Sequence, residues 1–85
     1  MDKDLNNFTT ELINVLKKTK DLYGFLFTAQ TINAAGMNIE TLEVRSEDGS
    51  ICQTFHLQFL LQMKEKYKAT MKDIAYYIVD EMGLR

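Results

Sequence analysis

The single cysteine and single histidine of this chain are the first residues to consider for chemistry, because together they could form a nucleophilic pair or hold a metal ion. Cys52 and His56 are four residues apart, on one side of an alternating segment. On an extended strand, at about 3.3 Å per residue, their Cα atoms would lie roughly 13 Å apart. A nucleophile and its base must lie within hydrogen-bonding distance of each other. We therefore expect an ordinary strand face here, with neither a metal site nor a catalytic pair.

The remaining polar residues do not predict an enzyme either. Acidic residues are scattered singly or stand at expected turns and helix ends, as Asp48, Asp73 and Asp80 do. The sequence contains no glycine-rich phosphate loop and no hydrolase or metalloprotease motif. We expect a protein without catalytic residues, metal or cofactor.

Three lysines form the clearest charged pattern. Lys64, Lys68 and Lys72 are spaced i, i+4, i+8 and would line one face of a continuous helix. With Tyr67 and Tyr76 nearby, such a face could bind single-stranded nucleic acid. The net charge of −2 favours a simpler interpretation, a solvated lysine face over an apolar stripe. Nucleic-acid binding is therefore a minor alternative.

The most informative structural signal is a pair of alternating segments on either side of Asp48-Gly49. This dipeptide favours a two-residue type I′ turn, whose central residues both have positive φ. We expect strands at about 39–46 and 50–59. The expected register pairs Ser46 with Ile51, Val44 with Gln53 and Leu42 with Phe55, which puts the apolar residues on one face. The end of the second strand stays open between His56 and Met63, because the same residues also suit a helix.

Helical periodicity is present on both sides of this hairpin. Apolar spacing over residues 5–18 favours a helix, with a strand at 8–16 as the weaker alternative. The apolar segment at about 24–35 is predicted as a second, buried helix that Ala34-Ala35-Gly36 would end. The weaker alternative is a strand that includes Tyr23, Phe25 and Phe27. Thr70 and Asp73 match a capping box, and an apolar stripe follows them as far as Gly83.

Length and composition indicate a single small globular domain over residues 1–85. The chain is 46% apolar and 26% charged, and its one cysteine fits a reducing compartment. The N-terminal residues do not match a signal peptide, and no segment is apolar enough to span a bilayer. We expect a cytoplasmic α+β domain: two N-terminal helices, the hairpin, and a C-terminal helical segment packed on the hairpin's apolar face.

Two segments between residues 20 and 40 resemble a passage of ACT domains, small regulatory modules with a ferredoxin-like fold. They are Lys20-Asp21-Leu22-Tyr23-Gly24-Phe25-Leu26 and Ala34-Ala35-Gly36-Met37-Asn38-Ile39-Glu40. The resemblance implies an alternative fold with a ferredoxin-like βαββα order. It also implies an amino-acid site at a dimer interface, to which Asp21, Gly24 and Asn38 would contribute.

The functional expectation is a non-enzymatic protein that acts by binding another protein. Small size, the lack of a catalytic set and open strand edges favour an adaptor or inhibitor, of the kind that phages and mobile elements carry. A homodimer formed through a hairpin edge is part of this expectation. The alternative is a regulatory module that senses a small molecule, as the ACT-like passage implies.

Overall fold

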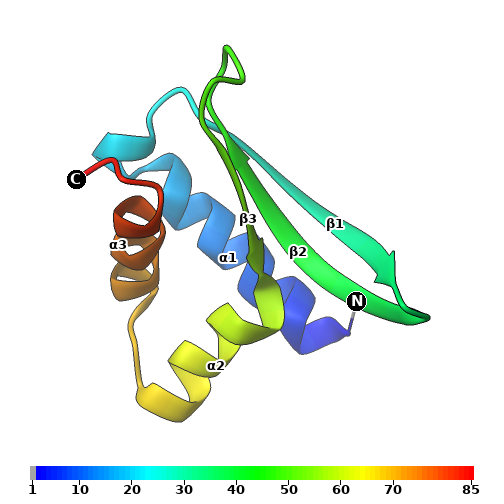
Figure 1. The fold of residues 1–85 in the computed structure, drawn as a ribbon. Helices are drawn as coiled ribbons and strands as arrows, with labels where there is room; N and C mark the ends of the chain where they lie inside the picture. The colour runs from blue at the N-terminus through cyan, green and yellow to red at the C-terminus, as the bar shows by residue number, and fades with distance from the viewer. Residues whose placement is uncertain (1) are drawn as a thin grey trace.

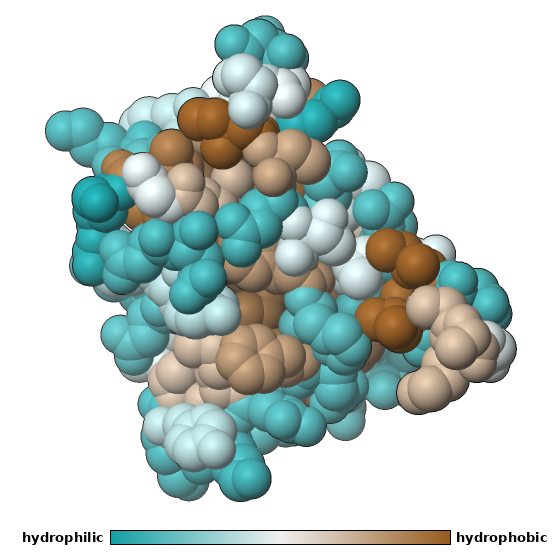
Figure 2. Space-filling model, in the orientation of Figure 1, coloured by the Kyte–Doolittle hydropathy of each residue, from teal (hydrophilic) through white to brown (hydrophobic). Residues whose placement is uncertain are grey.

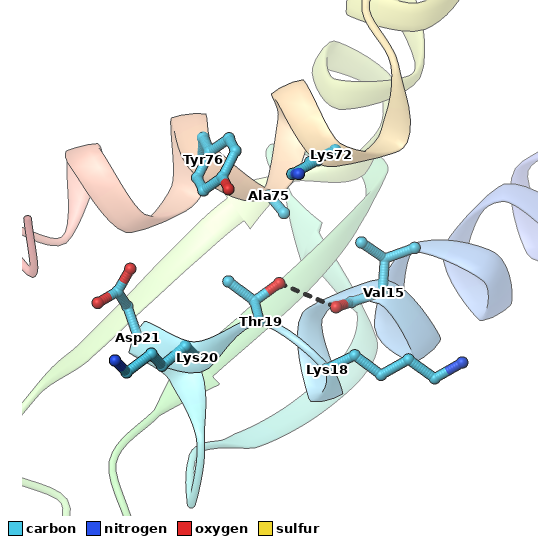
Figure 3. Close-up of a pocket in the computed structure, with 8 residues that line it drawn as sticks. All are labelled: Val15, Lys18, Thr19, Lys20, Asp21, Lys72, Ala75 and Tyr76. Carbon is cyan, nitrogen blue, oxygen red and sulfur yellow. Dashed lines mark hydrogen bonds between the residues drawn. The ribbon is translucent and has the colours of Figure 1, made fainter.

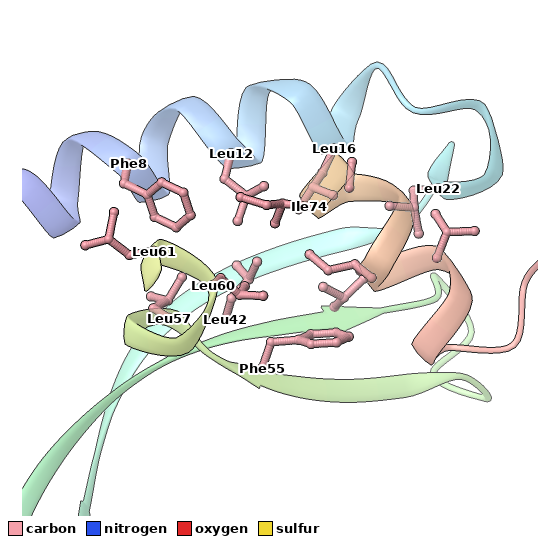
Figure 4. Packing of buried hydrophobic residues seen from close by; sticks show 14 of the residues in the cluster. Phe8, Leu12, Leu16, Leu22, Leu42, Phe55, Leu57, Leu60, Leu61 and Ile74 are labelled. Carbon is pink, nitrogen blue, oxygen red and sulfur yellow. The ribbon is translucent and has the colours of Figure 1, made fainter. Parts of the chain in front are cut away.

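The computed structural model describes residues 2–85, which form helices packed on one face of a three-stranded antiparallel sheet (Figures 1 and 4). The elements are α1 (Lys3–Lys17), η1 (Lys20–Leu22), β1 (Leu26–Ala34), β2 (Met37–Arg45), β3 (Cys52–His56), α2 (Leu57–Tyr67) and α3 (Met71–Glu81). The sheet order is β1-β2-β3. The predicted α+β class is confirmed, but the order of elements differs from both expected orders.

The predicted second helix at about 24–35 is wrong. Residues 26–34 form β1, which pairs with β2 from Leu26 opposite Arg45 to Ala34 opposite Met37. Almost every β1 side chain is exposed, so the segment has no buried face to give it a periodicity. Its apolar content suggested a buried helix, whereas pairing with β2 makes it a strand.

The type I′ geometry expected at Asp48-Gly49 occurs instead at Ala35-Gly36. These two residues connect β1 to β2, and their φ angles are +52° and +77°. Positive φ at both central residues is what a type I′ turn requires, and its twist matches that of the flanking strands. Ala34-Ala35-Gly36 thus closes a hairpin rather than ending a helix.

The turn at residues 47–50 is longer than predicted. Four residues separate Ser46 from Ile51, the Ser46 N–H donates to the Ile51 carbonyl over 2.7 Å, and within this turn only Gly49 has positive φ. The Asp48 carboxylate accepts hydrogen bonds from the N–H of Ser50 and from the hydroxyls of Ser50 and Ser46, at 2.8–3.0 Å. These bonds favour the charged carboxylate and lower the pKa of Asp48 to about 2.

The register predicted for the second hairpin is confirmed. Leu42 lies opposite Phe55 and Val44 opposite Gln53, so the apolar residues of β2 and β3 share the face that the helices cover. The second strand is shorter than expected, however. It ends at His56, and α2 begins at Leu57, because Leu57, Leu60 and Leu61 have helical spacing and are buried against the core.

The terminal helices follow their sequence signals. Residues 8–16 are helical within α1, and the Asp2 carboxylate caps this helix by accepting from the Leu5 N–H at 2.8 Å. Thr70 and Asp73 form the predicted capping box of α3, with bonds of 2.9 and 3.0 Å. The predicted C-terminal helical segment consists of two helices, α2 and α3.

The core lies between the helices and the covered face of the sheet. Figure 4 shows α1 contributing Leu12 and Leu16, which face Ile74 of α3 and Leu60 of α2 above Leu42 of β2. All five side chains are fully buried. Within residues 2–85 no helix lies on the other face of the sheet, so this part of the chain forms two layers with one side of the sheet open.

Replacing Ala35 with asparagine should stabilise the fold by roughly 0.5–1 kcal/mol. An alanine at φ +52° is in the left-handed region, which asparagine tolerates better, and Asn-Gly is a preferred type I′ pair. Urea unfolding of the wild type, Ala35→Asn and the control Ala34→Asn measures the effect. The control should show no gain, because Ala34 lies in β1. An equal gain from both variants would contradict this explanation.

Candidate functional site

The structure places Cys52 and His56 as the sequence analysis expected. They begin and end β3, and both side chains are exposed. Within residues 2–85, no three histidine, cysteine, aspartate or glutamate side chains come together as metal ligands would. The geometry of this strand therefore offers no chemistry beyond that of a free thiol and an exposed imidazole.

The predicted lysine face on one continuous helix is wrong. Lys64 lies in α2 and Lys72 in α3, while Lys68 ends α2 in the left-handed conformation, with φ +61°. The chain therefore changes direction at Lys68, and the Ala69 N–H returns to the Met63 carbonyl at 3.0 Å. The three ammonium groups do not form the single helical stripe on which the nucleic-acid hypothesis depended.

The residues implied by the ACT resemblance are also dispersed. Asp21 lies in η1, Gly24 precedes β1, and Asn38 lies next to the far turn of the β1-β2 hairpin, where it accepts a 3.1 Å hydrogen bond from Asn33. The nine-residue length of β1 separates Gly24 from this turn. The structure does not bring these three residues into one site.

One pocket nevertheless combines a residue of the nucleic-acid hypothesis, Lys72, with a residue of the ACT hypothesis, Asp21. It has a volume of about 560 Å³ and lies between α3 and the segment that joins α1 to η1 (Figure 3). Asp21 and Lys72 both line it, and the half-buried Tyr76 forms part of its wall. The Lys72 ammonium lies 5.7 Å from the centre of the Tyr76 ring, and the Arg85 guanidinium 4.8 Å from it. An ammonium, a carboxylate and an aromatic ring can together bind a small charged molecule.

The other candidate site is the edge of the sheet formed by β1. Eight of the nine β1 residues are exposed. The residues that flank a two-residue turn form a hydrogen-bonded pair, and such pairs alternate along an antiparallel ladder. Starting from Ala34 and going back along β1, the backbone groups of every second residue bond to β2. The backbone groups of the residues in between point away from β2. The outward N–H and C=O groups belong to Phe27, Ala29, Thr31 and Asn33.

This edge lacks the features that usually prevent strands from associating. Residues 22–39 include no charged side chain and no proline. Each β1 residue has one partner on β2, so no bulge distorts the strand. Natural sheets commonly protect such edges with lysine, proline, bulges or a covering element. The β1 edge is therefore well suited to pair with another extended segment.

The polarity of each face of the β1-β2 hairpin changes along its length. Near the core the covered face is apolar, but towards the turn the same face is polar. Thr31 donates to Glu40 at 2.8 Å there, beside the Asn33–Asn38 bond. The opposite face of the hairpin end carries Ile32 paired with Ile39 and Ala34 paired with Met37, a group that we call the hairpin-end patch.

The hairpin-end patch is accessible to a partner. Ile32 is 41% exposed and Met37 66% exposed. Figure 2 shows apolar surface gathered at this end of the molecule, where the hairpin extends beyond the helices in Figure 1. The sequence analysis missed both the patch and the edge, because it assigned residues 24–35 to a helix. The sequence signal that could have indicated this hairpin was the uncharged segment around Ala35-Gly36, which contains Thr and Ile residues typical of strands.

Comparison of the chain with protein-family models, curated proteins and solved structures finds no match. Within residues 2–85, no helix combines the length and apolar character needed to cross a bilayer.

Amide hydrogen exchange in dilute protein should alternate along β1. The outward N–H groups of Phe27, Ala29, Thr31 and Asn33 should exchange rapidly, whereas those of Thr28, Gln30 and Ile32 should be protected by β2. Residue-resolved exchange measured by NMR tests this directly. Uniform protection along the strand would contradict the free edge, and uniformly fast exchange would contradict the β1-β2 pairing.

Proposed function

We propose that this chain is a non-enzymatic protein that acts by binding another protein, and that the partner adds an extended segment to the β1 edge. The observation that carries the proposal is a nine-residue edge strand that is exposed, uncharged and free of bulges. Strand addition of this kind gains affinity from main-chain hydrogen bonds and specificity from alternate side chains. The chain would serve as a regulatory adaptor or inhibitor, and the free thiol of Cys52 fits a cytoplasmic location.

The side chains along β1 indicate which segments would fit. An added strand places its own residues beside Leu26 and Ile32 on the open face, and beside Phe27 and Ala29 on the covered face. Leu26 is 45% exposed and Phe27 is half-buried at the margin of the core. A partner segment with apolar residues at alternate positions and little charge would extend both surfaces.

Blocking one outward donor should weaken binding while the fold is retained. Proline at position 31 removes an N–H that points away from β2, a position that edge strands tolerate. Thr31→Val is the matched control, because both variants lose the bond to Glu40 but only Thr31→Pro loses the outward N–H. Extended peptides selected from a random display library on the wild type should bind Thr31→Pro about tenfold more weakly or worse. They should bind Thr31→Val like the wild type.

Two results would argue against the proposed edge. The selected peptides could bind Thr31→Pro as tightly as the wild type, or they could map to the helices in hydrogen exchange. Circular dichroism of each variant verifies that the helices and sheet are intact.

A second candidate function, small-molecule sensing, is favoured by the pocket that Asp21 and Lys72 share. A ligand that carries both an acidic and a basic group, such as an amino acid, would satisfy both side chains. Both are exposed, so the ligand would exchange freely with solvent.

A thermal-shift screen against amino acids and nucleotides tests this candidate. A true ligand at about 100 times its Kd should stabilise the protein by about 2.7 kcal/mol. The shift should shrink in Lys72→Gln and persist in Lys64→Gln, whose side chain lies outside the pocket. If no compound shifts the wild-type melting temperature, small-molecule sensing is ruled out for these ligand classes. Equal shifts in both variants would place the ligand elsewhere.

A further inference from the structure

We propose that the segment captured by β1 is the β1 strand of a second copy of this chain, which joins the two sheets into one. This inference rests on the proposed function, since it names the partner at the same edge. Three strands from each copy would form a continuous six-stranded antiparallel sheet around a two-fold axis.

The length and register of β1 define how two copies would pair. Full antiparallel overlap of residues 26–34 sets Leu26 opposite Ala34 of the second copy and places the axis at Gln30. Phe27 then meets Asn33 of the second copy, and Ala29 meets its Thr31. These are the four residues whose backbone groups point outward, so every outward N–H and C=O finds a partner. Four hydrogen-bonded pairs supply roughly eight backbone bonds.

Charge favours this pairing. A two-fold axis places the residue on it, Gln30, opposite its own copy, so a charge at or near that position would come close to a like charge. Residues 22–39 have none, although the chain as a whole carries −2. The strand that would lie on the axis is therefore the part of the molecule where self-association brings no like charges together.

The apolar side chains support the same arrangement. A two-fold axis perpendicular to the sheet keeps the open faces of both copies on one side and both helix layers on the other. On the open face, Leu26 of one copy reaches Ala34 and Met37 of the second copy. Leu26 and Met37 are 45% and 66% exposed in the single chain. Each hairpin-end patch would thus gain an apolar neighbour from the other subunit.

Gln30 provides a test specific to this axis. It is exposed, and its two copies would face each other as a non-hydrogen-bonded pair. Light scattering over a concentration series should show a wild-type dimer. Gln30→Lys and Gln30→Glu should each dimerise about fivefold more weakly or worse, since like charges then lie opposite each other. An equal mixture of the two should restore association as a heterodimer, detected by native mass spectrometry.

A cysteine cross-link tests the register. In a Cys52→Ser background, Gln30→Cys should form an intermolecular disulfide, because directly opposed residues lie within the Cα distance that a disulfide needs. Thr28→Cys in the same background is the matched control. Its two copies would be offset by four residues, roughly 13 Å along the strands, and should stay uncross-linked.

The outcomes separate this inference from the function on which it rests. A strict monomer at high concentration without the Gln30→Cys cross-link would overturn self-pairing, while peptide binding sensitive to Thr31→Pro would still support strand capture. A dimer that persists in both charge variants and cross-links equally through Thr28→Cys would also overturn the inference, because it would use a different surface or register. Loss of both dimer and peptide binding in Thr31→Pro, with both retained in Thr31→Val, supports the two proposals together.

Discussion

The rest of the structure depends on β2, because among the strands of residues 2–85 it is the one that pairs on both sides. Its ladder to β1 and its ladder to β3 define the sheet, while Leu42 and Val44 bury their side chains completely under the helices. Helix α1 packs its apolar face against α2 and α3, α2 contacts β2 and β3, and α2 follows β3 without an intervening loop. The backbone pairing of β2 thus places β1 and β3, and the burial of its side chains forms the floor of the core on which the helices assemble. A domain of this size has little buried surface beyond this core.

The helices cover only part of the sheet, because the β1-β2 hairpin extends beyond them. The core ends near Leu42, whereas β1 and β2 continue to the Ala35-Gly36 turn with polar residues on the covered face and Ile32 and Ile39 on the open one. The apolar residues of the hairpin end therefore do not belong to the core, because they lie on the opposite face of the sheet. These apolar residues face away from the helices of residues 2–85, and Ile32 and Met37 are left exposed. The β1-β2 pair therefore contributes to the core near Leu42 and carries the hairpin-end patch near the Ala35-Gly36 turn.

The parts of the fold that could be predicted from sequence are those where a single local pattern coincides with burial. The Leu42–Phe55 register followed from alternation, and the helix of residues 3–17 and the cap at Thr70 followed from their own spacing. The candidate edge could not be found this way. With no buried face, β1 carries no alternating pattern, and its apolar residues suggested a helix. The capping box at Thr70 marked the start of a separate helix, but the end of the preceding helix at Lys68 was not predicted, since a lysine in the left-handed conformation has no distinct sequence signal.

The change in polarity along the covered face of the hairpin makes its two ends differ in how easily the strands open. Near Leu42, opening the strands would expose core side chains to water, whereas near Asn33 and Asn38 opening costs only main-chain bonds and one amide contact. The end of the hairpin therefore has a lower free energy of local unfolding than the part beside Leu42, and it can fray and close again while the core stays folded. A surface of this kind can adjust its twist to whatever it meets, which lets a small domain keep a rigid body and an adaptable arm in one continuous sheet.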